Sequence, residues 1–333
     1  MSRIVIWVAA IFAVLYAGYW VVGWQGALRA VPVWADDRRA EGWQVDYSDL
    51  SVRGFPSRFD TTLSDLAVAD PRTGWAWEGA FFQLLALSYR PNHLIAVLPP
   101  AHTLSTPLAR YDLTQDQARA SLVVTFEANP QIDRSTVVID APRVSTRDWT
   151  SSANSLRFAT RRLDGAPLTH EIGLQTQGLV PSDGIKAQLD PAGLLPRAIE
   201  TLRLDAALSF DAPWDLRALE QRRPQITALD LREARASWGG MDLRLTGMLD
   251  VDSFGLASGQ ITVQAQNWRA MLDVAERGGA LPARLRPLLE SALEGLSDLS
   301  GRAETLDLDL TITGGRISVG FLPLGQLPPL VLR

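Results

Sequence analysis

Few residues in this sequence have the types and spacing that catalysis or metal binding requires. The three histidines, His93, His102 and His170, stand far apart, and none belongs to a His-x-x-x-His or His-Glu-x-x-His pattern. Because a metal site needs several convergent ligands, we expect no metal at any of them. We expect His93, which follows a Pro-Asn pair, to lie in a turn. Asp307 and Asp309 could form a carboxylate pair, but their alternation with leucines is typical of the solvated face of a strand.

Nucleophilic and phosphate-binding motifs are also missing. The chain has no cysteine, which excludes thiol nucleophiles and zinc-thiolate sites. It has no Gly-x-Ser-x-Gly sequence, and Lys186, the only lysine, does not belong to a glycine-rich phosphate loop. The net charge of -5 gives no basic footprint for nucleic acid. We therefore predict a protein that is not an enzyme and binds neither cofactor, metal nor nucleic acid; a hydrolase without a recognisable motif is the alternative.

The N-terminal segment has the composition of a membrane anchor. Residues Ile4 to Val22 include no charged side chain, and a helix of this length spans roughly 28 Å, close to the ~30 Å hydrocarbon core of a bilayer. The far end carries the aromatic residues of a membrane-interface belt, Tyr19, Trp20 and Trp24. We predict a tail at 1–3, a transmembrane anchor at 4–24 and a helical stalk at 25–41 that is interrupted by Pro32.

A cleaved signal peptide is the alternative interpretation of this segment. Cleavage requires small residues at positions -3 and -1, and no such pair occurs between Ala9 and Ala30. The sequence therefore favours an uncleaved anchor. Arg3 precedes the helix, and this weak positive-inside bias places residues 42–333 on the extracytoplasmic side.

From Trp43 onward, hydrophobic residues recur with period two and are separated by turn sequences. We predict a mainly β fold of the α+β class, with an antiparallel meander across residues 42–333 that could curl into a groove. Strands are expected near 75–78, 82–88, 94–98, 120–127, 136–141, 156–161 and 171–177. Short helices near 214–221, 267–277 and 282–298 would cap the sheet, and a division into halves is possible near 181–184.

Two glycine pairs allow the strand register to be predicted. A turn at Gly239-Gly240 or at Gly314-Gly315 places apolar residues on one face of each hairpin. The first turn would pair Trp238 with Met241, Ala236 with Leu243, and Ala234 with Leu245. The second would pair Ile312 with Ile317, Leu310 with Val319, and Leu308 with Phe321.

Several of these turn and strand motifs resemble one protein family. They are the stretch Arg-Gly-Phe-Pro-Ser-Arg-Phe at 53–59, Arg-Pro-Asn-His at 90–93, Asn-Trp-Arg at 267–269, and residues 314–325. Together with the anchor, they resemble the domain-of-unknown-function 2125 (DUF2125) proteins of alphaproteobacteria over nearly the whole chain. More distantly, the layout resembles the AsmA-like envelope proteins. That resemblance implies a sheet folded around an apolar groove and a link to lipid transport.

The predicted function combines the anchor with the one-sided sheet. We expect a single-pass protein of the bacterial inner membrane, with most of the chain in the periplasm, that binds or transfers lipid-like molecules. A non-catalytic assembly factor that contacts other envelope proteins is the alternative. The candidate groove residues are Trp238, Leu243, Leu308, Leu310, Ile312, Ile317, Val319 and Phe321.

Overall fold

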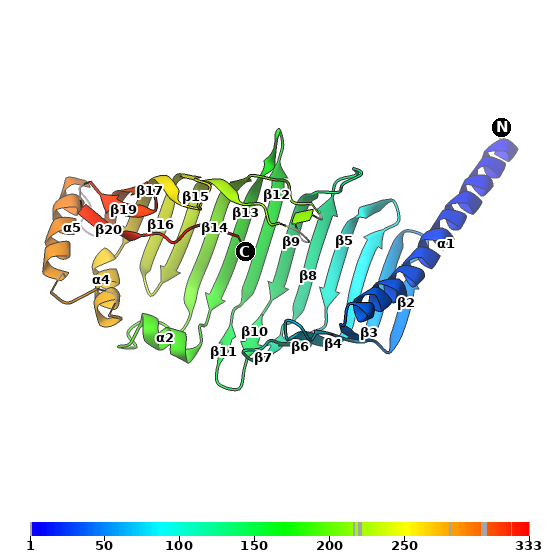
Figure 1. The fold of residues 1–333 in the computed structure, drawn as a ribbon, viewed down its shortest axis with the longest axis horizontal. Helices are drawn as coiled ribbons and strands as arrows, with labels where there is room; N and C mark the ends of the chain where they lie inside the picture. Colours follow the sequence, from blue (N-terminus) through cyan, green and yellow to red (C-terminus); the bar gives the residue numbers. More distant parts are fainter. Residues whose placement is uncertain are drawn as a thin grey trace. The chain divides into compact units, whose positions relative to one another are not determined.

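The computed structural model describes residues 2–215, 217–218, 222–279, 281–284, 286–300, 305–320 and 322–332. Strands dominate this part of the chain, as predicted, and Figure 1 shows neighbouring strands of each part lying side by side. The described strands belong to one large antiparallel sheet that is not closed into a barrel. The described helices are α1 (Ser2–Ala40), α2 (Asp183–Leu189), α4 (Trp268–Arg277) and α5 (Arg286–Ser300).

Helix α1 runs without a break through the predicted anchor and stalk. Pro32 lies inside it, so the predicted interruption is wrong. Proline removes one helical hydrogen bond, but contacts with the sheet hold the turns that follow it. Ala35 is fully buried, and the Arg39 guanidinium donates two hydrogen bonds to the Val45 carbonyl, at 3.0 and 2.6 Å.

The chain forms two compact units. Unit 1 comprises residues 1–126, 137–140 and 144–148. In it β3 pairs with β1, β2 and β4, while β4 also pairs with β5 and β6. Strand β5 pairs with β8, and β6 pairs with β7. The strands are β1 (Gln44–Asp46), β2 (Asp49–Arg53), β3 (Arg58–Asp70), β4 (Trp75–Leu87), β5 (Arg90–Leu98), β6 (Ala101–Ser105), β7 (Arg110–Thr114) and β8 (Gln117–Val124).

Unit 2 comprises residues 127–136, 141–143 and 149–333, so β9 (Ile132–Asp140) and β10 (Arg143–Ser145) are divided between the units. From β12 to β20, each described strand of unit 2 pairs with the next along the chain. The strands are β11 (Thr150–Ser152), β12 (Ser155–Leu163), β13 (Ala166–Leu179), β14 (Ile199–Phe210), β15 (Ile226–Trp238), β16 (Met241–Val251), β17 (Ala257–Gln266), β18 (Thr305–Thr313), β19 (Arg316–Val319) and β20 (Leu322–Gln326).

The predicted hairpin registers can be compared directly with the structure. All three pairs across Gly239-Gly240 are confirmed. Across Gly314-Gly315 the pairing of Ile312 with Ile317 is confirmed, and β19 ends at Val319, while Phe321 lies outside the described residues. These glycines have φ between 55° and 82°, the left-handed region that two-residue turns of this kind require.

The helix predictions near the C-terminus are confirmed as α4 and α5, although α5 begins at Arg286. Near 214–221, Arg217 and Ala218 are helical, and residues 216 and 219–221 lie outside the described part. The suggested division near 181–184 does not coincide with the unit boundary. Strands β13 and β14 flank that position and pair along most of their length, so they keep it inside unit 2.

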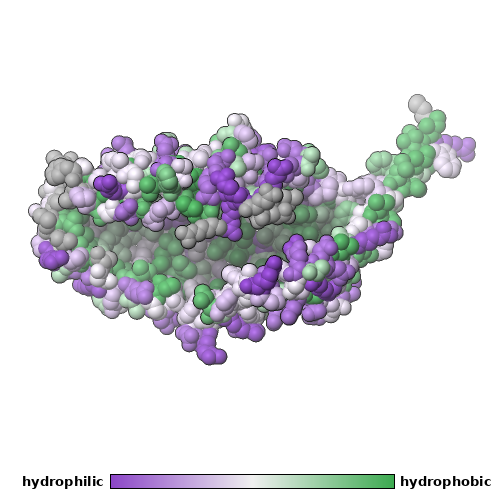
Figure 2. Space-filling view, in the orientation of Figure 1, coloured by the Kyte–Doolittle hydropathy of each residue, from purple (hydrophilic) through white to green (hydrophobic). Residues whose placement is uncertain are grey.

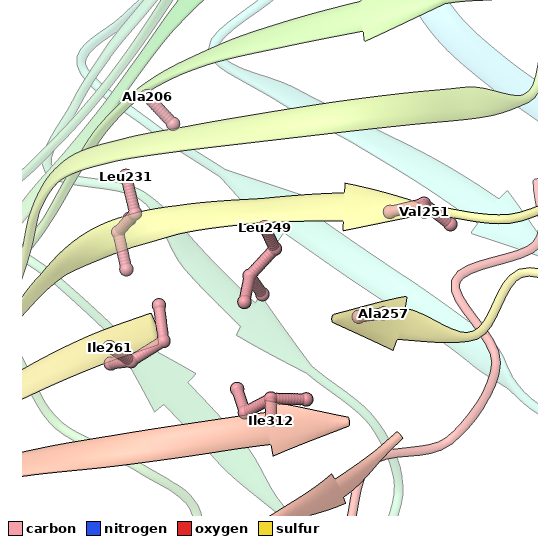
Figure 3. Packing of buried hydrophobic residues seen from close by; sticks show 7 residues of the cluster. All are labelled: Ala206, Leu231, Leu249, Val251, Ala257, Ile261 and Ile312. Atoms are coloured by element: carbon pink, nitrogen blue, oxygen red, sulfur yellow. The ribbon is translucent and has the colours of Figure 1, made fainter. Parts of the chain in front are cut away.

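The core of unit 2 lies on one face of its sheet. Figure 3 shows apolar side chains from β14 to β18 pointing toward one another, among them Leu231, Leu249 and Ile261. Charged residues of neighbouring strands pair on the other face: Glu233 forms ion pairs with Arg203 at 3.1 Å and with Arg244 at 3.2 Å. A bulge after Leu231 turns Glu233 to that face, although the two residues are two positions apart on the same strand. The alternation of strand side chains thus separates an apolar face from a charged one.

Candidate apolar binding site

An apolar cavity of about 600 Å³ lies in unit 1 between the last turns of α1 and the strands β3 to β5. Its volume is within the range of about 300–1,000 Å³ that is typical of small-molecule sites. The lining side chains are those of Ala30, Val31, Trp34, Thr61, Leu63, Leu66, Val68, Trp77, Phe82, Leu84 and Leu98.

Strand pairing explains why these side chains gather. Thr61 pairs with Leu84 and Leu63 pairs with Phe82, so both pairs project from the same face of the sheet. Farther along, Val68 pairs with Trp77, although strict alternation would turn these two residues to the opposite face.

A local change of backbone conformation at Asp65 reverses that alternation. Asp65 has φ of 49°, in the left-handed region, which aspartate tolerates better than most residues. Its carboxylate accepts a hydrogen bond of 2.7 Å from the Ser48 hydroxyl. As a result, Leu66 and Val68 continue the cavity wall that Leu63 begins.

Helix α1 is held over this wall by its aromatic residues. The Tyr19 hydroxyl donates to the Ser88 carbonyl at 2.6 Å, the Trp20 indole donates to the Arg58 carbonyl at 2.9 Å, and the Trp24 indole donates to the Val52 carbonyl at 3.1 Å. The residues predicted as an aromatic belt therefore attach the helix to unit 1, whereas Ile4 and Val22 are exposed.

A glycine allows close contact at the centre of this attachment. A Cβ atom on Gly23 would lie 2.4 Å from Cζ of Phe59, whose ring stacks on Trp20. No side chain larger than hydrogen fits there without displacing the ring. The helix therefore passes above β3 at a fixed short distance, and the turns that carry Ala30 and Trp34 reach the cavity.

The cavity wall can hold an apolar group but carries no group for acid–base chemistry. Thr61 supplies the one polar side chain in the lining, and none of the lining residues titrates. His102 contacts the ring of Trp77 with 5.8 Å between centroids, but it is not part of the lining. Burial lowers the pKa of His102, with partial opposition from a hydrogen bond to the Pro99 carbonyl.

The other two histidines serve the sheet. His93 lies within β5, so the predicted turn is wrong: its Nε2 atom lies 2.8 Å from the Ser121 hydroxyl on β8, and this contact joins the strands. His170 is buried in β13 beside the ring of Phe210. Among the described residues, no group of three His, Cys, Asp or Glu side chains is arranged to hold a metal.

The groove residues predicted from the sequence lie in unit 2. Leu310, Ile312 and Ile317 belong to the hydrophobic cluster of Figure 3, which Leu327 and Leu330 also join. Val319 is half-buried, and Phe321 lies outside the described residues. In this cluster the apolar face is therefore packed against side chains of the same unit.

The remaining predicted residues lie under or beside helices of unit 2. Leu243 and Leu308 pack against the buried Trp268, where α4 and α5 add Met271, Leu272 and Leu293. The Trp238 indole donates to the Pro196 carbonyl at 2.9 Å, and the Lys186 amine lies 5.3 Å from its ring centroid. Figure 2 shows that hydrophobic side chains also line the hollow over the middle strands of this unit.

The predicted carboxylate pair lies on the charged face of unit 2. Asp309 accepts a hydrogen bond of 2.7 Å from Thr262, and Asp307 borders a polar depression of about 290 Å³. Arg235 and Arg244 line the same depression. These contacts match the solvated strand face that the sequence favours.

The sequence predicts the strands and the helix that border the cavity, but it does not predict that the helix packs over the sheet. The alternating Thr61, Leu63 and the apolar run at Phe82–Leu84 indicate a one-sided sheet. Nothing in the sequence pattern shows that Trp34, 27 positions before Thr61, folds over it. The one related signal is that small and apolar residues continue along the helix beyond the predicted anchor. They indicate that this part of the helix packs against an apolar surface, but they do not indicate which surface.

Comparison with known proteins identifies a family. The family model described as "Uncharacterized protein conserved in bacteria (DUF2125)" matches residues 20–328. No curated protein and no solved structure matches the chain.

Proposed function

This chain belongs to the DUF2125 family, and we propose that it is a membrane-anchored protein that binds a lipid-like molecule in the cavity between α1 and β3–β5. In this proposal α1 spans the bacterial inner membrane, and the two β units lie in the periplasm. The role is binding or transfer, without catalysis.

The observation that carries the proposal is the composition of the cavity wall. Its surface is almost entirely hydrocarbon and aromatic, so the favourable term for a ligand is apolar burial. Each methylene that leaves water contributes about 0.8 kcal/mol, so about ten methylenes contribute roughly 8 kcal/mol before the costs of association. A fatty acyl chain fits this requirement, whereas a polar ligand would lose hydrogen bonds to water that the wall does not replace.

Helix α1 supports the membrane part of the proposal. It is long and apolar enough to cross a bilayer, and its hydrophobic side chains from Ile4 to Leu15 are mostly exposed. Exposing isoleucine, valine and phenylalanine side chains on all sides of a helical segment is unfavourable in water but favourable in lipid.

Native mass spectrometry of the detergent-solubilised full chain, followed by lipid extraction, tests the proposal. We expect a stoichiometric lipid adduct on the wild-type protein. Ala30→Trp places a large ring in the cavity and should weaken lipid binding roughly 15-fold, because losing two methylenes of contact corresponds to about 1.6 kcal/mol.

Val33→Trp is the matched control, because Val33 is on the same helix, 59% exposed and outside the cavity wall. This variant should retain the wild-type adduct. A wild-type protein without any lipid adduct, or equal occupancy in both variants, would contradict the proposal.

A non-catalytic assembly factor is the second candidate, and the packing of unit 2 favours it. There the predicted groove residues are largely covered by α4, α5 and the C-terminal segment, so this unit would act through its surface. The exposed Met248 and Phe254 are accessible for such a contact. If the mass measurement finds no lipid, co-purification of a defined envelope protein that is lost in Met248→Asp would support this role.

A further inference from the structure

Three exposed aromatic residues lie in loops at one end of the strands of the unit 1 sheet. Phe55 lies in the β2–β3 turn and is 58% exposed, Tyr89 lies in the β4–β5 turn and is 62% exposed, and Phe126 follows β8 and is 76% exposed. We refer to Phe55, Tyr89 and Phe126 as the aromatic edge. Single exposed aromatics are common, but three on neighbouring loops make this end of the sheet a candidate contact surface.

The strand register places these loops at the same end of the sheet. Strand β3 pairs with β4 so that Arg58 faces Leu87, which brings the β2–β3 turn beside the β4–β5 turn. Val123 of β8 pairs with His93 of β5, and the Asn92 amide donates to the Val124 carbonyl at 2.7 Å. The end of β8 therefore adjoins the start of β5.

Hydrogen bonds between α1 and the β4–β5 turn show which residues of the helix lie beside the aromatic edge. The Tyr16 and Tyr19 hydroxyls both bond to Ser88, the residue before Tyr89, at 2.8 and 2.6 Å. Trp20 contacts the ring of Phe55 edge-on with 5.2 Å between centroids. The aromatic edge thus lies beside helix residues 16–20.

The part of α1 that precedes the aromatic edge is too short to cross a bilayer. Residues Arg3 to Leu15 are exposed, and this part of the helix is roughly 20 Å long, whereas the hydrocarbon core is ~30 Å thick. A span of about 20 residues from Ile4 ends near Gly23. In Figure 1 the N-terminal half of α1 extends beyond the strands, and its other half lies beside β2.

We infer that the aromatic edge is a second membrane-contact site, which inserts into the interface of the bilayer that α1 spans. This inference rests on the proposed membrane anchoring of α1. Aromatic rings are favoured at the headgroup level, where one side is apolar and the other wet. The exposed Arg53, Arg58 and Arg90 flank the same turns and match the phosphate groups of lipid headgroups.

Site-directed spin labelling tests this inference, and the absence of cysteine makes each label unique. The full chain with Phe55→Cys, Tyr89→Cys or Phe126→Cys is labelled with a nitroxide and reconstituted into vesicles of phosphatidylcholine and phosphatidylglycerol. We expect all three labels to collide more with oxygen and less with a water-soluble nickel chelate than the control label. Power-saturation measurements report both collision rates.

Leu108→Cys is the control, because Leu108 is 91% exposed in the β6–β7 turn at the opposite end of the sheet. A further label at Ile11 reports whether α1 itself lies in the hydrocarbon. If Ile11→Cys is in lipid while the aromatic edge is as aqueous as Leu108→Cys, the inference is overturned and the anchoring stands. An aqueous label at Ile11 would overturn the anchoring as well.

Discussion

At the scale of single residues, the buried His170 links stability to pH. Its side chain is 4% exposed and lies 6.1 Å from the ring of Phe210, measured between centroids. Burial lowers the pKa of His170 below its usual value of 6.5, the positive charge of Arg162 lowers it further, and Asp133 opposes the shift in part. The folded protein therefore favours the neutral imidazole.

The sign of the resulting pH dependence follows from proton binding. At a pH between the lowered pKa of His170 in the folded protein and its usual pKa in the unfolded chain, the unfolded chain binds more protons. The free energy of unfolding therefore falls as the pH is lowered through about 6.5. We expect His170→Gln to lose less stability than the wild type between about pH 7.5 and about pH 5.5. Urea denaturation at both pH values measures this, and equal losses in the two proteins would disprove it.

At the scale of elements, the docking of α1 depends on one glycine. Gly23 approaches Phe59 so closely that any side chain must displace the ring, whereas a Cβ atom on Gly18 would have no neighbouring atom within 4 Å. The two glycines lie on the same helix and differ in this contact.

We therefore expect Gly23→Val to destabilise unit 1 by about 1–3 kcal/mol, the usual cost of overpacking, and to expose the helix around residue 23. Gly18→Val should have a much smaller effect. Thermal unfolding in detergent and hydrogen exchange of the 20–30 segment provide the measurements. Equal effects of the two substitutions would show that the helix is not closely packed on β3.

The sequence predicts those elements whose signal is local. The Gly239-Gly240 turn is sufficient to predict the register of β15 and β16, and the alternation of Leu306 to Ile312 predicts strand β18, without knowledge of the fold. Helices α4 and α5 follow from their apolar periodicity in the same way.

Features that depend on distant contacts could not be predicted. The helix continues through Pro32 because Arg39 bonds to Val45, and the cavity wall continues past Asp65 because its backbone is left-handed. Neither fact leaves a periodic pattern. The predicted groove followed the clearest hairpins, and these lie in unit 2, where α4, α5 and the C-terminal segment supply much of the covering.

At the scale of the whole molecule, three features of unit 1 follow one another along α1. The aromatic edge lies beside residues 16–20, the proposed span ends near Gly23, and the cavity begins at Ala30. The helix rises about 10 Å between Gly23 and Ala30. In our proposal the cavity therefore opens just above the headgroups, where an acyl chain can enter it from the membrane.

Photocrosslinking from inside the cavity tests this central claim most directly. Phe82 is replaced by a benzophenone amino acid in the full-length protein in bacterial membranes, with Leu108 as the exposed control and Ile11 as the control within the span. After irradiation and proteolysis, the account predicts a lipid adduct on the peptide that contains position 82 and none at position 108. A lipid adduct at position 11 with none at position 82 would contradict it.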